Sequence, residues 1–231
     1  MLQLMKLEMK KSKLGWYVKG AIIANILMVV ILFLASYEAQ DIGDLDLRNV
    51  QILFFMVSTM VREIFTVFAG VLIAKLVVEE YKNKTILVMF SYAISRKKII
   101  ASKLLIITIL TFITVVLSNI FVAGSFFILN SYMLVIPNEI TIDELIMEEI
   151  KSIPFAIAAA GTSIIPLYFG MRKYSVPTTV ISSLIVSMVA YQNSPDFSLG
   201  NFLLFQLALA MIGIIIAYYE TKNIENKDIV L

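Results

Sequence analysis

Long apolar stretches recur along the chain, and they constrain its fold more than any other feature of the sequence. Hydrophobic residues make up 60% of the 231 positions and charged residues 16%. A water-soluble domain is closer to roughly 45–50% apolar and about 25% charged. A helix that crosses the hydrocarbon core of a bilayer needs about 20 mainly apolar residues. The sequence therefore predicts an all-α integral membrane protein, not a soluble domain or a disordered chain.

Six stretches have the length and composition of membrane spans. The fifth is the shortest, since its residues reach only roughly 24 Å along a helix axis against a hydrocarbon core of about 30 Å. The six predicted spans are residues 20–37, 51–78, 104–134, 154–170, 176–191 and 201–219. They form one transmembrane domain that occupies residues 1–231.

The segments between the spans differ in charge, and this difference predicts the orientation. Segments 1–19, 79–103, 171–175 and 220–231 together hold 15 Lys and Arg residues, whereas the alternate segments hold only Arg48 and Lys151. By the positive-inside rule, the basic segments face the cytoplasm. The prediction is therefore six transmembrane helices with both termini inside and a cytoplasmic tail over 220–231.

Two of the connecting segments have helical patterns of their own. Residues 1–19 alternate apolar and lysine positions, which favours a basic interfacial helix or simply a lysine-rich flank. In the outer segment 135–153, Thr141 and Glu144 have capping-box spacing and begin an acidic amphipathic helix. Pro154 then suits the first turn of the fourth span, and Pro166 predicts a kink within it.

Few polar residues lie within the predicted spans, and each group has two interpretations. Arg62 and Glu63 lie near the outer interface, where a long side chain can snorkel to water or line a translocation path. Thr179, Ser183 and Ser187 share one face of the fifth span. These three hydroxyls either line the path or mediate helix packing.

Several kinds of chemistry lack their residues in this sequence. There is no His and no Cys, which argues against a catalytic triad, a thiol nucleophile and most zinc sites. None of the nine glycines is followed by Lys, so there is no P-loop. We expect a protein that is not an enzyme, has no metal site, binds no cofactor directly and does not bind nucleic acid.

The segment 79–103 is too long for a tight turn and too apolar in its centre for a solvated loop. Ile86, Leu87 and Phe90 predict a short helix with an apolar face, and Arg96 and Lys97 form part of a basic rim. Such a helix either docks on another protein or lies flat on lipid.

This segment resembles the permease subunits of ABC-2 type transporters. Their pattern has an acidic residue, a Gly-Thr pair, a leucine-rich turn, Ser-x-Pro-(Ile/Val)-Ser-Arg and a Lys at the start of the third helix. Lys84 stands in place of the Gly and Ala93 in place of the Pro. The matching residues are Glu80, Thr85, Ile86, Leu87, Ser91, Ile94, Ser95, Arg96 and Lys103.

The resemblance implies a function and a set of partners. It implies an exporter subunit in the bacterial cytoplasmic membrane, which pairs with a second permease as a homodimer or heterodimer amid membrane lipid. A separate cytosolic ABC ATPase binds ATP and Mg and docks on the cytoplasmic coupling helix between spans two and three. Small permeases of this kind are similar to exporters of amphipathic or antimicrobial peptides that give self-immunity. The coupling interface is then expected at Glu79, Glu80, Thr85, Ile86, Leu87, Phe90, Ser91, Ser95, Arg96 and Lys97.

Other classes of function stay open from the residues alone. A stand-alone secondary transporter or channel for a hydrophobic small molecule needs no partner ATPase. A structural or regulatory membrane protein needs no path at all. The family also has a re-entrant outer hairpin between its last two spans, and residues 192–200 are the place for a reduced form of it.

Overall fold

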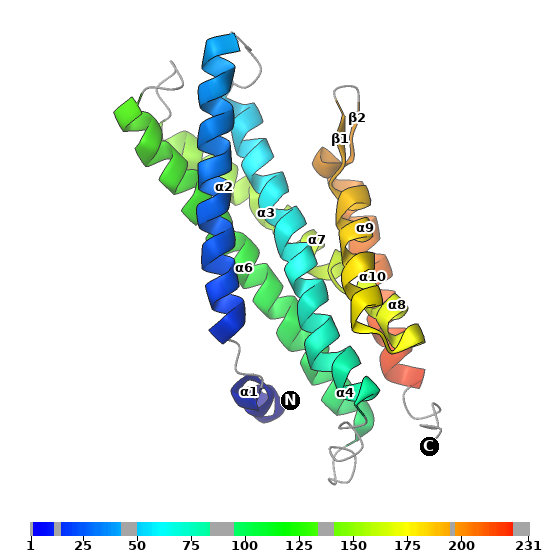
Figure 1. Ribbon diagram of the computed structural model, residues 1–231. Helices are drawn as coiled ribbons and strands as arrows, with labels where there is room; N and C mark the ends of the chain where they lie inside the picture. Colours follow the sequence, from blue (N-terminus) through cyan, green and yellow to red (C-terminus); the bar gives the residue numbers. More distant parts are fainter. Residues whose placement is uncertain are drawn as a thin grey trace.

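The computed structural model describes residues 2–11, 15–42, 50–83, 95–133, 141–194 and 197–223. These residues form an elongated bundle of helices whose long members alternate in direction (Figure 1). A hairpin of two-residue strands lies at the end of the bundle opposite α1. The elements are α1 (Leu2–Lys11), α2 (Gly15–Ile42), α3 (Val50–Ile73), η1 (Ala74–Val78), α4 (Glu79–Lys82), α6 (Arg96–Met133), α7 (Ile142–Thr162), α8 (Pro166–Lys173), α9 (Val176–Ala190), β1 (Asn193–Ser194), β2 (Phe197–Ser198), η2 (Leu199–Asn201) and α10 (Leu203–Asn223).

Four helical stretches are long and apolar enough to cross a membrane. They are Gly15–Ser36, Arg96–Asn130, Ile142–Lys173 and Leu203–Lys222. They overlap four of the six predicted spans, and this confirms the prediction of a helical chain compatible with a membrane. The shorter apolar helix α9 coincides with the predicted fifth span. Its crossing and that of residues 51–78 stay predictions.

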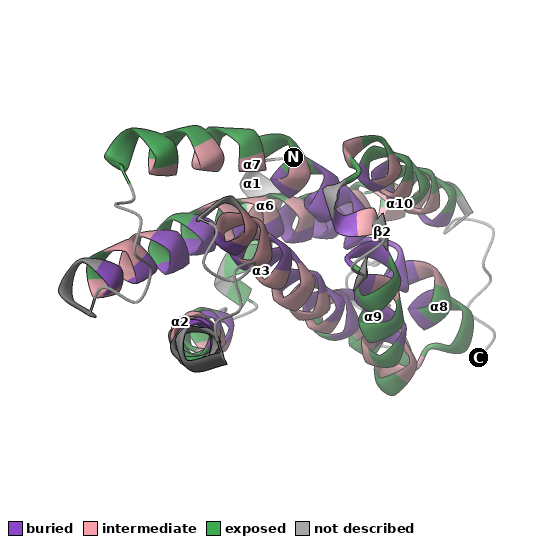
Figure 2. Ribbon diagram, turned by 90° about the horizontal axis from the view of Figure 1, so that it is seen from above, coloured by how far each residue is buried: buried purple, intermediate pink, exposed green. Residues whose placement is uncertain are grey.

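The outer helices present apolar side chains on their surfaces. Ile22, Ile26 and Leu34 of α2 are exposed, as are Met211 and Ile215 of α10. Viewed from above, α10 is largely exposed, whereas α3 and the second half of α7 are mostly buried or half-buried (Figure 2). Exposed apolar helices at the rim around a buried interior are what a lipid environment favours.

The helix around Pro154 differs from the predicted boundaries. The outer amphipathic helix and the fourth span are one helix, α7, and Pro154 lies inside it. The prediction that Pro154 starts a helix is wrong, because a proline removes only one backbone donor and the helix continues on either side of it. The break comes at Pro166, the first residue of α8, as expected. The capping box at Thr141 is confirmed by a 3.1 Å bond from its backbone N–H to Glu144 Oε2.

The helices also extend past the predicted span ends at the end that carries α1. The α3 helix continues through a π-helical turn, η1, into α4. At the start of α6, Arg96 begins the helix eight residues before the predicted span. Helices α4 and α6 therefore enter the segment 79–103 from its two sides. The centre of the segment, residues 84–94, lies outside the described residues.

Three buried apolar clusters lie in the described bundle, and the two large ones lie toward its opposite ends. The first includes Tyr17, Leu72 and Ile107, and the second includes Met28, Phe65 and Val122. The Tyr17 hydroxyl lies 3.1 Å from Thr114 Oγ1, which satisfies a polar group inside the first cluster.

Candidate functional site

A buried ion cluster lies where α1, α4 and α6 meet. Lys103 on α6 has a side chain that is only 1% exposed. Its Nζ donates to Glu8 Oε2 at 3.0 Å and to the Leu76 carbonyl oxygen at 3.0 Å, and it forms an ion pair with Glu80 Oε2 at 2.9 Å. We call Glu8, Glu80 and Lys103 the Lys103 cluster. The ammonium group of Lys103 thereby contacts three separate elements, α1, η1 and α4.

The π-helical turn η1 supplies the carbonyl group for this cluster. In η1 the backbone hydrogen bonds span five residues and not four: the Glu79 N–H donates to the Ala74 carbonyl. The Leu76 carbonyl inside this turn accepts a hydrogen bond from Lys103 Nζ. Short π-helical turns are often found at functional sites, because they redirect a helix and free a backbone group.

The cluster borders a polar cavity of about 380 Å³. Across it, Lys11 Nζ reaches Glu80 Oε1 at 2.9 Å, so this carboxylate bridges two lysines. Lys75 Nζ lies 4.1 Å from the centre of the Trp16 ring, in cation–π geometry. The N-terminal helix α1, which we call the elbow helix, and the start of α2 are thereby held against η1 and α4, which continue α3.

A second contact at the same end joins α4 to the turn between α8 and α9. The rings of Tyr81 and Tyr174 stack with centroids 5.9 Å apart. Tyr174 is in the left-handed conformation, with φ of 46°. Burial raises the pKa of the Tyr81 hydroxyl above its ordinary value, so the charged form becomes still less accessible.

The predicted coupling residues fall into three groups. Glu80 belongs to the Lys103 cluster, and Glu79 beside it is exposed. Ser95 precedes α6, and Arg96 and Lys97 are half-buried in its first turn. The other predicted coupling residues lie outside the described residues: Thr85, Ile86, Leu87, Phe90 and Ser91.

Arg62 is buried, and the expectation that it snorkels is wrong. Its side chain is 2% exposed. Its guanidinium donates to the Ser58 carbonyl at 2.9 Å, to Thr59 Oγ1 at 3.1 Å and to the Gly200 carbonyl at 3.3 Å. It also lies 4.7 Å above the Phe155 ring. These partners inside the bundle take the place of the water molecules that would hydrogen-bond a snorkelling arginine. The neighbouring Glu63 is half-buried.

Replacing Arg62 with Lys is expected to lower the free energy of unfolding by about 1.5–3 kcal/mol. Lysine keeps the charge, but its single ammonium lacks the planar fork that reaches acceptors on two elements. Thermal unfolding in detergent measures the loss. Arg172→Lys is the matched control, because Arg172 is exposed on α8. Equal stability of the two variants contradicts the bridging role.

The α9 hydroxyls lie at a tight helix interface. Thr179, Ser183 and Ser187 are at most 1% exposed, and each donates to a carbonyl of the preceding turn. A methyl group added to Gly70 of α3 would overlap with Ser183. This geometry supports the packing interpretation. A role in lining a path stays a prediction.

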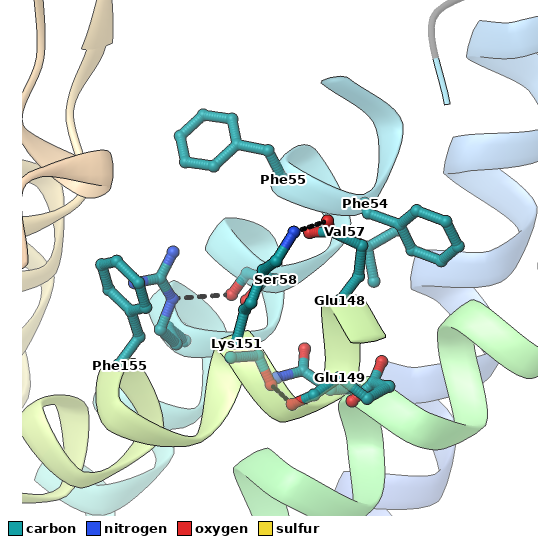
Figure 3. A pocket seen from close by; sticks show the side chains of 11 residues that line it. Phe54, Phe55, Val57, Ser58, Glu148, Glu149, Lys151 and Phe155 are labelled. Carbon is teal, nitrogen blue, oxygen red and sulfur yellow. Dashed lines mark hydrogen bonds and ion pairs between the residues drawn. The ribbon is translucent and has the colours of Figure 1, made fainter. Parts of the chain in front are cut away.

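A second polar cavity, of about 300 Å³, lies between α3, α6 and α7. Phe54, Phe55 and Phe155 form apolar walls, and Lys151 points toward Glu148 (Figure 3). Lys151 Nζ lies 2.6 Å from Glu148 Oε1. The remaining lining residues are Val57, Ser58, Arg62, Asn119, Glu149 and Ser152.

Sequence reasoning missed several of these residues. Glu8 is the one acidic residue before Glu38, and that isolation in a basic segment was an available signal. No comparable signal in the sequence marks Leu76 or Asn119. The contact of the Leu76 carbonyl with Lys103 and the burial of the Asn119 amide both depend on the tertiary structure. Among the described residues no group of three or more acidic side chains gathers as a metal site would require.

Comparison with known proteins gives one clear relative. No protein-family model and no solved structure matches the chain. The chain is 44% identical over 227 residues to a Bacillus subtilis (strain 168) protein described as "Uncharacterized protein YcbO". The aligned region covers 98% of this chain and 100% of that protein.

Proposed function

The chain belongs to the family of the Bacillus subtilis protein YcbO, and we propose that it is the membrane permease subunit of an ABC-2 type exporter. In this proposal six helices cross the bacterial cytoplasmic membrane, with both termini inside. A separate ATPase binds ATP and Mg, and a second permease completes the path. The cargo is an amphipathic or antimicrobial peptide.

The Lys103 cluster is the observation that carries this proposal. It fastens the elbow helix α1, the end of α3 with α4, and the start of α6 to one another. Segment 84–94 therefore connects two helix ends that are held together at its base. A push on this segment by a partner would move α3 and α6 as a unit, since an ion cluster with several short contacts resists local separation.

The distribution of charge at the helix ends supports the proposed orientation. Lys82 ends α4, Arg96 and Lys97 begin α6, Lys173 ends α8 and Lys222 lies in the last turn of α10. The ends that bear these residues lie on the same side of the bundle as α1 (Figure 1). A single basic end is what the positive-inside rule requires of the cytoplasmic face.

The test is co-purification of an ATPase from membranes in mild detergent. Phe90→Asp and Arg96→Glu are expected to weaken its retention by about tenfold or more, because each replaces an anchor or rim residue of the coupling surface. Phe90→Leu and Arg96→Lys are the matched controls, and both should retain the ATPase. Membrane insertion and yield should be equal for all four variants.

Two results would contradict the proposal. One is wild-type protein that never co-purifies with an ATPase, and the other is ATP-driven export that proceeds normally in Phe90→Asp. Either result would favour the stand-alone secondary transporter. The buried cation of Arg62 would then be the first group to examine, because charges at membrane depth often mark a transport path.

A further inference from the structure

The cavity between α3, α6 and α7 contains a buried cation that has no counter-ion in the part of the chain that the structure describes. Arg62 forms no ion pair with any described residue, and its three hydrogen bonds go to neutral oxygens. A guanidinium has five N–H donors, so part of its capacity is unused. A buried cation is costly unless an anion compensates it. The side of the cavity lined by Arg62 therefore favours an anionic oxygen group.

The same cavity is lined by a buried amide that has no partner. Asn119 on α6 is 1% exposed, and within the described chain neither its Oδ1 nor its Nδ2 makes a hydrogen bond. Buried side-chain amides are nearly always hydrogen-bonded to protein or to ordered water. Asn119 thus offers both a donor and an acceptor to a group that enters the cavity.

The acidic residues of the cavity complete the charge pattern. Glu148 is neutralised by Lys151 at 2.6 Å. The half-buried carboxyl group of Glu149 forms no ion pair with a described residue, and burial raises its pKa to about 7, so a cation bound beside it would stabilise its charged form. As far as the described residues show, the cavity therefore presents one cation without a counter-ion, Arg62, and one carboxyl group without a cation partner, Glu149. A purely anionic ligand would meet the carboxylate, and a purely cationic ligand would meet the guanidinium.

We propose that this cavity binds a small zwitterionic group, in which an ammonium is joined to a carboxylate or phosphate. The anionic oxygens bind Arg62 and the Asn119 amide, and the ammonium binds Glu149. The aromatic walls lower the local polarity, which strengthens both ion pairs. The phosphoethanolamine head of a lipid and the free zwitterion of an amino acid or peptide share this chemistry.

This site is separate from the coupling site and does not rest on the proposed function. Asn119 and Lys103 are both on α6, and they lie roughly 24 Å apart along the helix axis. Loss of ATPase binding would leave the cavity intact, and loss of zwitterion binding would leave the Lys103 cluster intact. The two failures are therefore distinguishable by experiment.

The test measures binding to the full chain in a neutral maltoside detergent by titration calorimetry. The probes are phosphoethanolamine, which carries both charges, and ethanolamine and methyl phosphate, which carry one each. The variants are Asn119→Leu and Glu149→Gln. Asn25→Leu is the matched control, because Asn25 on α2 also has a buried unpartnered amide oxygen but does not line the cavity.

We expect wild type and Asn25→Leu to bind phosphoethanolamine at least about tenfold more tightly than either single-charge probe, since each lost charged contact weakens binding by that order. Asn119→Leu should bind about tenfold more weakly and be no less thermally stable than wild type. Glu149→Gln should bind methyl phosphate and phosphoethanolamine equally. Equal binding of all three probes to wild type, or full binding by Asn119→Leu, would overturn the proposal and leave a water-filled cavity.

Bilayer nanodiscs distinguish the two sources of the group. Thermal stabilisation by phosphatidylethanolamine but not by phosphatidylcholine, whose quaternary ammonium has no N–H donor, identifies a lipid head group. Equal stability in both lipids, together with phosphoethanolamine binding in detergent, identifies a free zwitterion. Each outcome supports the zwitterion site.

Discussion

Replacing Lys103 with Met is expected to lower the free energy of unfolding by about 3–5 kcal/mol, since removal of one partner leaves a buried charge uncompensated. Glu8 is 8% exposed, and Lys103 is its ion-pair partner among the described residues. Glu80 keeps Lys11 but loses its buried contact. Methionine preserves most of the apolar stem of lysine, so the loss reports the ammonium and not a cavity. Thermal or denaturant unfolding in detergent measures it.

Lys98→Met is the matched control for this prediction. Lys98 is exposed on the first turn of the same helix, so its variant should lie within about 0.5 kcal/mol of wild type. A second comparison adds Glu8→Gln and Glu80→Gln to Lys103→Met. Removing all three charges should recover at least half of the loss, because neutral buried groups carry a much smaller desolvation cost. A triple variant as unstable as Lys103→Met would contradict the ion-cluster explanation.

Gly213→Ala is expected to lower the free energy of unfolding by about 1–3 kcal/mol. Helices α7 and α10 cross with backbone nearly in contact: a methyl group at Gly213 would overlap with the Gly161 carbonyl oxygen. A methyl group at Gly161 would in turn lie 2.7 Å from Ala210 Cβ. Rigid backbone cannot yield as a flexible side chain does, so the two helices must separate. Unfolding in detergent gives the loss.

Gly124→Ala tests the same substitution where there is room. Gly124 lies within α6, and no atom lies within 4 Å of a methyl group placed there. Alanine should therefore stabilise the helix by about 0.5–1 kcal/mol through its higher helix propensity. Equal losses at Gly213 and Gly124 would show that the effect is not close packing of α7 on α10.

Much of the secondary structure could be predicted from the sequence, because apolar length and caps are local properties. The capping box at Thr141, the break at Pro166 and a helix at residues 176–191 all have close counterparts in the structure. The exact ends could not be predicted. A π-helical turn at Ala74–Val78 and a helix that passes through Pro154 depend on neighbouring elements, which no local pattern encodes.

The site could be predicted only in part. Glu80 and Lys103 both match one sequence motif, yet nothing local indicates that they contact each other or that Glu8 joins them. Arg62 stood out as a charge in an apolar stretch, but its burial depends on Gly200 and Phe155 from distant segments. The spacing of the hydroxyl residues places them on one face of α9. The sequence does not indicate that Gly70 of α3 packs against Ser183 on that face.

The sequence by itself determined that this chain forms apolar helices with one basic end, because hydropathy and charge are summed along each segment. Only the tertiary structure decided which charges are compensated. Glu8 and Lys103 are 95 residues apart and meet at 3.0 Å, whereas Arg62 is buried among neutral groups. Ion pairing acts over a few ångströms in space, so a buried lysine at one end is held in an ion cluster, whereas a buried arginine in the other half of the bundle has only neutral hydrogen-bond partners among the described residues.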